Sequence, residues 1–162
     1  MSEEQARTDA EEIAARKARG RAIMEKLTGS ADATTALLTA LSPDYVEWVT
    51  EFALGQVWAR PGLDLKTRSL CTVAALTVLG RMDNLKTHIR GALGNGATRK
   101  EIIEVILHMT VYGGFPDAWD GLAAAREVFA AIDARSPDGT FNEQAAPETL
   151  SYEEETGAGT GE

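Results

Sequence analysis

The sequence has little cysteine and no apolar run long enough to cross a membrane. Cys71 is the one cysteine in 162 residues, which excludes an internal disulfide, a CxxC redox pair and a cysteine-rich zinc site. The most apolar run, Leu70–Leu79, is too short to span a bilayer. The segment Met1–Arg19 is charged and lacks the apolar stretch of a secretory signal. These absences predict a reduced cytoplasmic protein with no membrane partner.

A basic surface is also missing. The formal net charge is −9 and no basic patch dominates, so we expect no nucleic-acid partner. Seven of the nine excess negative charges fall in Ser136–Glu162, which contains no Lys or Arg, so Met1–Arg135 carries only −2. That final segment is rich in Gly, Ser, Thr, Pro and Glu, a composition typical of disorder. The sequence therefore predicts one domain in residues 1–135 and an acidic, disordered tail in residues 136–162.

Strand patterns are absent as well. The β-branched residues occur at helical spacing, and no turn joins two alternating segments. We therefore expect an all-α fold of six to seven helices with short loops. The expected helices are Thr8–Leu27, Ser30–Ala40, Ser42–Trp58, Leu65–Leu79, Asp83–Leu93, Thr98–Tyr112 and Pro116–Ile132.

Local signals mark several helix ends and faces. Ser42 is a suitable N-cap before Pro43, and Thr98 with Glu101 forms a capping box. The helix that contains Leu65–Leu79 has almost no polar side, and such a helix is normally buried in the core. After Ser42, helical spacing places four residues on one face: Tyr45, Val49, Phe52 and Ala53.

The chain has two histidines, and histidine exchanges protons near neutral pH. His88 lies between Leu85 and Ile89 on an apolar helix face, where a hydrogen-bonded core histidine is the alternative to a catalytic one. His108 follows Glu104 by four residues, so the two side chains can form a surface ion pair instead of serving a site. Two histidines without an obvious third ligand predict no metal site.

Arg68 lies one turn into the most apolar helix, where an unpaired guanidinium is costly. Its partner is either Glu51, in a structural ion pair, or a substrate carboxylate, which arginine binds through two parallel hydrogen bonds. Cys71, one turn further on, is expected to be an inert packing residue. Large aromatic residues are expected to pack in the core or between subunits, namely Trp48, Trp58 and Trp119.

Three blocks of residues occur in a characteristic order and spacing. The first block comprises Glu51–Trp58, Arg60–Asp64 and Thr67–Leu70. The second block comprises Leu85, His88, Gly91–Gly96, Thr98 and Glu101–Ile102, and the third comprises Leu107–His108 and Val111–Pro116. Together these blocks resemble the carboxymuconolactone decarboxylase family, and the resemblance covers roughly Ala15 to Ile132, essentially all of the predicted domain.

The resemblance implies the all-helical fold of the alkylhydroperoxidase-D-like proteins, which are homo-oligomers, often trimers or hexamers. In the peroxidase branch of that fold, a CxxC precedes the histidine that corresponds to His88, with three residues between. The matching positions here are Arg81 and Asn84. Peroxide or disulfide chemistry on that pattern is therefore excluded.

The decarboxylase branch acts on 4-carboxymuconolactone without a cofactor, so the resemblance implies a carboxy-lyase of aromatic catabolism. The unsaturated lactone accepts the electrons released as carbon dioxide leaves. The protein must hold the carboxylates, stabilise an enolate oxygen and deliver a proton. We expect Arg68 to hold a carboxylate, with His88 and His108 as general acid and electrostatic partner. Glu51 would orient a histidine or pair with Arg68.

The sequence departs from the family pattern near these residues. In the first block, Leu54 replaces a typical Trp and Gln56 replaces a frequent Glu. In the last block, Cys, Val, Ala and Asn are replaced by Gly113, Phe115, Asp117 and Trp119. These changes favour a larger or more aromatic substrate. We expect the substrate to contact Gln56, Trp58, Tyr112, Phe115 and Trp119.

Three functions are compatible with these observations. The first is a cofactor-free decarboxylase of a carboxylated unsaturated lactone. The second is an enzyme of the same fold that catalyses a cyclisation, dehydration or decarboxylation of a larger aromatic or polyketide-like intermediate in specialised metabolism. The third is a non-catalytic oligomeric scaffold or ligand-binding protein, which is disfavoured by three polar groups on mostly apolar helices: Arg68, His88 and His108.

Overall fold

The computed structural model of the chain describes residues 2–135, with the backbone alone at residues 3 and 32–34. Every regular element in this part is a helix, so the all-α prediction is confirmed. The expected tail, residues 136–162, lies outside the described residues. The elements are α1 (Glu3–Thr28), α2 (Ala31–Leu41), α3 (Pro43–Glu47), η1 (Trp48–Trp58), α4 (Leu65–Val78), α5 (Met82–Gly94), α6 (Arg99–His108), α7 (Thr110–Gly113) and α8 (Phe115–Asp133).

These elements form seven helical rods within residues 2–135, because α3 runs directly into η1 and one residue separates α6 from α7. The number agrees with the six to seven helices expected. None of the rods in this part of the chain combines the length and apolar character that a membrane crossing requires.

Short polar residues explain where several helices begin. The Ser42 Oγ accepts a hydrogen bond from the Tyr45 N–H at 3.3 Å, and Pro43 then opens α3. The Asp64 Oδ1 accepts a hydrogen bond from the Thr67 N–H at 2.9 Å at the start of α4. The capping box expected at the start of α6 is also present. Each cap satisfies a backbone N–H that the first helical turn leaves unpaired.

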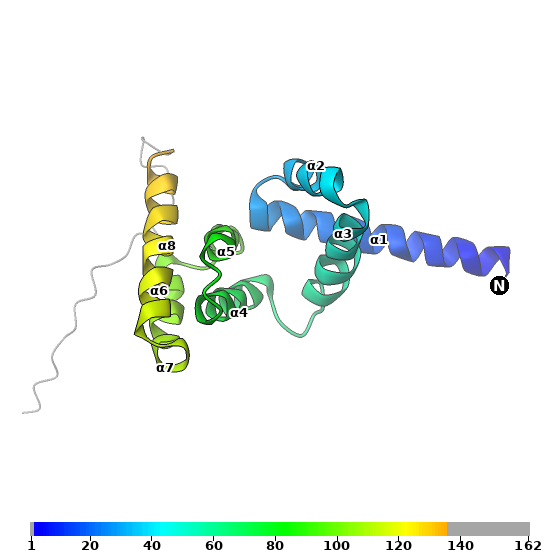
Figure 1. Cartoon of the computed structure of the whole chain (residues 1–162). Coiled ribbons are helices and arrows are strands. Elements are labelled where there is room, and N and C mark those ends of the chain that lie inside the picture. The colour runs from blue at the N-terminus through cyan, green and yellow to red at the C-terminus, as the bar shows by residue number, and fades with distance from the viewer. Residues whose placement is uncertain (1, 136–162) are drawn as a thin grey trace, which may run out of the picture.

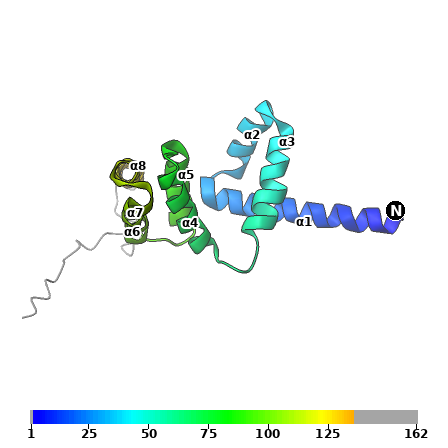
Figure 2. The same ribbon diagram turned by 60° about the horizontal axis from the view of Figure 1, so that its bottom comes forward.

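The helices form three groups in a row, as Figure 1 and Figure 2 both show. The N-terminal group contains α1, α2, α3 and η1, the middle pair is α4 and α5, and the C-terminal group contains α6, α7 and α8. A large apolar core joins the middle pair to the C-terminal group through fully buried residues that include Val73, Leu85, Ile89, Ile102, Ile106 and Val128. A smaller apolar cluster holds the N-terminal group together through Ile23, Met24, Leu27, Ala31 and Leu54.

In the N-terminal group, α1 and η1 touch backbone to backbone. A Cβ added to Gly20 would lie 1.8 Å from the carbonyl oxygen of Thr50, and one added to Gly55 would lie 2.3 Å from that of Arg16. Glycine is the residue that lets two backbones approach this closely, because it has no Cβ. Gly55 therefore fixes the position of η1, and of the side chains that η1 carries, against α1.

The element η1 is a π-helix of 11 residues, a rare conformation that is frequently found at functional sites. Val46, Thr50 and Leu54 are buried along α3 and η1, whereas Tyr45 and Phe52 are exposed. The face expected for this helix is therefore wrong at Tyr45 and Phe52, whereas Val49 does pack against the smaller apolar cluster. The buried residues recur every four positions and are offset by one residue from Tyr45, Val49 and Ala53.

One side of α4 is uncovered in the described chain. The helix buries Ser69, Val73 and Thr77, but Cys71 and Leu79 are exposed. The prediction that this helix is buried on all sides, with Cys71 packed inside, is therefore wrong for the single chain. An apolar helix sequence indicates that the helix surface is poorly suited to contact with water. It does not indicate whether other helices of the same chain bury that surface.

The three tryptophans were expected to pack in the core or between subunits, and their burial differs. Trp48 is 66% exposed and Trp119 is 75% exposed, so neither packs in the core of the described chain. Trp58 is partly buried and packs against the smaller apolar cluster. Packing of Trp48 and Trp119 between subunits stays a prediction.

Gly55→Ala should destabilise the fold, because the new methyl group meets backbone atoms that cannot rotate away. Overpacking of this kind costs about 1–3 kcal/mol, and we expect urea unfolding to show a loss of at least that size. Gly62→Ala is the control, since a Cβ there has no heavy atom within 4 Å and exposed substitutions change stability by less than about 0.5 kcal/mol. Equal stability of the two variants would contradict the described contact between α1 and η1.

Candidate active site

His88 is placed by α5 and faces the π-helix. Its neighbours on that helix, Leu85 and Ile89, are fully buried and hold the histidine ring at the edge of the core. The ring centroid lies 6.2 Å from that of Trp58 on η1, with an interplanar angle of 33°. The His88 Nδ1 is buried, and no group in residues 2–135 forms a hydrogen bond with it. The alternative of a core histidine with a hydrogen bond at Nδ1 is therefore not met within residues 2–135. A buried nitrogen without a partner is suited to a hydrogen bond with a ligand or a water molecule.

Burial lowers the pKa of His88, because removal from water disfavours the charged imidazolium. In the chain alone the ring is therefore mostly neutral at neutral pH. A carboxylate placed beside it would act in the opposite direction and favour the protonated ring.

Arg68 holds the turn between η1 and α4. Its Nε donates a hydrogen bond to the Leu63 carbonyl oxygen at 3.2 Å, and its Nη2 donates one to the Arg60 carbonyl oxygen at 2.9 Å. A guanidinium has five N–H donors, so three donors of Arg68 have no partner in residues 2–135. The side chain is anchored by carbonyl groups and keeps donors for a carboxylate.

Glu51 does not pair with Arg68. Its Oε1 lies 3.7 Å from the Nη1 of Arg16 on α1, and no described residue joins it to a histidine. The structural alternative for Arg68, an ion pair with Glu51, is therefore wrong, because η1 turns Glu51 toward α1. Gln56, on the same helix, is partly buried. The orientation of a histidine by Glu51 and the contact of Gln56 with a substrate stay predictions.

The remaining predicted residues lie in the C-terminal group. His108 ends α6 and is exposed, and its ring lies edge-on to that of Tyr112 at 5.3 Å and 65°. The ion pair considered for His108 and Glu104 is not formed in the described chain. Phe115 and Trp119 are exposed at the start of α8. These side chains form an open aromatic surface, and none of them contacts His88 through a described ring contact or hydrogen bond.

Ring contacts join the predicted site residues in two pairs, His88 with Trp58 and His108 with Tyr112. Arg68 bonds to the turn that follows η1 and forms no hydrogen bond with either histidine within residues 2–135. The sequence interpretation missed the π-helix that carries Glu51. The one signal in the sequence for this element was Gly55 inside the Glu51–Trp58 block, because such a glycine indicates a close backbone contact.

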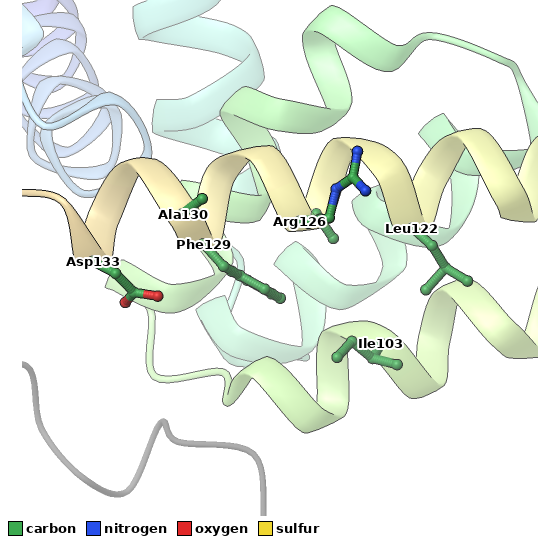
Figure 3. Close-up of a pocket in the computed structure, with 7 residues that line it drawn as sticks. Ile103, Leu122, Arg126, Phe129, Ala130 and Asp133 are labelled. Atoms are coloured by element: carbon green, nitrogen blue, oxygen red, sulfur yellow. The ribbon is translucent and has the colours of Figure 1, made fainter. Parts of the chain in front are cut away.

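A pocket of about 320 Å³ opens between α6 and α8. In Figure 3, Ile103 of α6 faces the side chains of Leu122 and Phe129 on α8, and Arg126 and Asp133 also line the pocket. This pocket contains none of the predicted site residues, so we assign it no catalytic role. Within residues 2–135, no three side chains of the metal-binding types cluster closely enough to share an ion.

The lowered pKa of His88 predicts how the free energy of unfolding changes with pH. Because burial lowers that pKa, the unfolded chain binds more protons than the folded chain once the pH falls below about 6.5, the ordinary value for histidine. This group leaves stability unchanged above that pH and reduces it as the pH falls further. Urea unfolding from about pH 7.5 to about pH 5.5 should therefore show a smaller decline for His88→Asn than for the parent chain.

His108→Asn is the matched control, since it removes an exposed histidine and should keep the parent decline. The same decline in all three proteins would contradict the enclosure of His88.

Known proteins resemble the region that contains this site. Residues 43–127 match the model of the carboxymuconolactone decarboxylase family. The chain is 44% identical over 92 residues to a 4-carboxymuconolactone decarboxylase of Acinetobacter baylyi, which covers 57% of this chain and 69% of that protein. It is 42% identical over 81 residues to a nitrosuccinic acid decarboxylase of Metarhizium robertsii, covering 50% and 57%. An uncharacterised protein of Paracoccus denitrificans is 41% identical over 85 residues, covering 51% and 63%. With its helical fold and this match over more than half of its length, the chain belongs to the carboxymuconolactone decarboxylase family.

Proposed function

We propose that the chain is a decarboxylase of a carboxylated, unsaturated lactone similar to 4-carboxymuconolactone. The observation that carries this proposal is the 44% identity over 92 residues to a protein named for that reaction. The region that matches the family contains Arg68, His88 and His108. The buried, unpartnered Nδ1 of His88 gives further support, because a bound acid would supply the missing hydrogen bond.

The reaction needs a place for negative charge and a source of one proton. When the bond between the ring carbon and the carboxylate breaks, its electron pair moves through the unsaturated lactone onto the carbonyl oxygen, and carbon dioxide leaves. The enolate then takes a proton on carbon. No electrons are gained or lost overall, so the residues need only bind the acid, stabilise the enolate oxygen and transfer the proton.

The proposed roles follow from the surroundings of each residue. Arg68 binds a substrate carboxylate through the donors that its turn leaves unused. The bound negative charge favours the protonated form of His88, which then donates its proton to the enolate carbon. Trp58 lies against the imidazole and supports its orientation. His108 acts as the electrostatic partner of the enolate oxygen.

A second candidate is the decarboxylation of a different activated acid. The relative at 42% identity is named a nitrosuccinic acid decarboxylase, and a nitro group, like an unsaturated lactone, can accept the electron pair that a departing carboxylate leaves behind. The aromatic residues Phe115 and Trp119 also support a larger substrate, including an intermediate of specialised metabolism. A cyclisation or dehydration of such a substrate would use the same acid–base groups.

His88→Asn should remove most of the turnover of 4-carboxymuconolactone, because asparagine cannot transfer the proton. The expected loss in kcat is about 10²–10⁴-fold, the usual contribution of a general acid, measured as release of carbon dioxide. Arg90→Gln is the control, since Arg90 is exposed on the same helix and should keep parental turnover.

Unchanged turnover by His88→Asn would exclude the proton-donor role. If the parent chain released no carbon dioxide from this lactone but did so from another activated acid, the second candidate would replace the first.

A further inference from the structure

The two acids proposed as substrates share one chemical unit. In 4-carboxymuconolactone the ring carbon that loses carbon dioxide also carries a CH₂–carboxylate arm, and in nitrosuccinic acid the carbon with the nitro group carries the same arm. Each acid is therefore a succinate with an electron-accepting group on the carbon that reacts. One carboxylate leaves as carbon dioxide, whereas the carboxylate of the arm is retained in the product. A site for such an acid must distinguish the two carboxylates.

A carboxylate that arginine holds tightly is poorly suited to leave. Hydrogen bonds from a guanidinium stabilise the carboxylate anion, and this stabilisation is lost as the group becomes neutral carbon dioxide. Interactions that are stronger with the bound substrate than with the transition state slow the chemical step. Arginine is therefore suited to the retained carboxylate, and the leaving carboxylate is suited to an apolar neighbour such as an indole ring.

Arg60 and Arg68 are joined within one turn. The Arg68 Nη2 donates a hydrogen bond to the Arg60 carbonyl oxygen at 2.9 Å, and the Arg60 N–H donates one to the Val57 carbonyl oxygen at 3.4 Å. Ala59 and Leu65, near the two ends of the turn, both pack against the smaller apolar cluster. The backbone of Arg60 is therefore held on both sides, and one of the two bonds comes from Arg68.

The Arg60 guanidinium is available to a ligand. It is exposed and forms no hydrogen bond or ion pair with any group in residues 2–135. A Cβ on Gly62, which lies between the two arginines in the sequence, would have no heavy atom within 4 Å, so the space beside the turn is open. Arg68 adds the donors that its bonds to the turn leave unused. A carboxylate has enough lone pairs to accept hydrogen bonds from both groups.

The charges of the turn favour an anion. Asp64 is the one acidic residue in positions 59–68, and its two oxygens accept hydrogen bonds from the Thr67 N–H at 2.9 Å and the Thr67 hydroxyl at 2.7 Å. Lys66 is neutralised by an ion pair with Glu101 at 2.5 Å. The two arginines therefore exceed the one remaining carboxylate by a single positive charge.

Trp58 connects this turn to the histidine. Its ring centroid lies 6.2 Å from that of His88. Arg60 follows Trp58 by two residues, so their Cα atoms are at most about 7 Å apart. The turn that carries the two arginines therefore begins beside the indole that lies against the imidazole.

We propose that Arg60 and Arg68 together bind the retained carboxylate of a substituted succinate, so that the leaving carboxylate lies on the side of Trp58 and His88. Arg60 is then a specificity-determining residue that selects dicarboxylic acids over monocarboxylic ones. This inference rests on the proposed function for the reaction, whereas the binding of a dicarboxylate does not depend on turnover.

The methyl ester of the CH₂–carboxylate arm tests which carboxylate the arginines bind. The ester removes the retained charge and keeps both the lactone and the leaving carboxylate. For the parent chain, kcat/KM should be at least about 100-fold higher for 4-carboxymuconolactone than for this ester. Arg60→Gln should lower kcat/KM for the diacid about 10–100-fold, the usual effect of a lost charge-assisted hydrogen bond. The loss should fall mainly on KM, and turnover of the ester should not change.

Two further variants make the result specific. Arg60→Lys keeps a positive charge without the planar fork and should recover part of the loss. Arg90→Gln makes the control substitution at an exposed arginine of α5 and should keep parental values for both substrates. Equal turnover of diacid and ester by the parent, an equal loss on both substrates in Arg60→Gln, or no loss on the diacid would each overturn the inference.

Binding separates this inference from the proposed function. The saturated lactone diacid lacks the double bond that accepts the electron pair, so it serves as a stable probe for isothermal titration calorimetry. Its Kd should rise about 10–100-fold in Arg60→Gln and stay unchanged in Arg90→Gln. Binding that depends on Arg60, in a chain that turns over no tested acid, would retain the carboxylate site and overturn the proposed function. Turnover that does not depend on Arg60 would overturn the carboxylate site alone, and absence of both binding and turnover would overturn both.

Discussion

The position of the candidate site depends on the contact between the backbones of α1 and η1. Gly20 and Gly55 have no Cβ, and their neighbours on the opposite helix come so close that any larger residue would meet main-chain atoms. This contact sets the depth at which η1 lies, and with it the places of Glu51 and Trp58. Because His88 faces Trp58, the same contact also decides what surrounds the imidazole. The packing of two glycines, which take no part in any reaction, therefore helps to determine the surroundings of His88.

Local signals in the sequence were sufficient for most of the helix starts and for the fold class. The N-cap at Ser42 and the capping box of Thr98 and Glu101 depend on residues only three positions apart, so no tertiary information was needed to find them. Local signals gave no indication of the π-helical conformation of η1, whose close backbone contact with α1 joins residues far apart in the sequence. The ion pair considered for Arg68 and Glu51 is absent, since Glu51 lies beside Arg16 on α1. The family resemblance identified the blocks, but could not say which of their residues meet in space.

Two environments now distinguish the two histidines. His88 is enclosed by core residues and an indole ring, and this burial lowers the pKa of its imidazole. His108 lies on an exposed surface beside a phenol ring. The two rings therefore differ in their access to water and in their aromatic neighbour.

The turn between η1 and α4 has a consequence for how an acid would reach the site. Arg68 is held by two carbonyl oxygens, which carry partial rather than full negative charge, so the guanidinium keeps a positive field around it. Most of the net charge of −9 falls in Ser136–Glu162, and Met1–Arg135 sums to only −2. Added salt screens the interaction of exposed charges over a distance of about 8–10 Å. For an acid that Arg68 attracts, the rate of association is therefore expected to fall as the ionic strength rises.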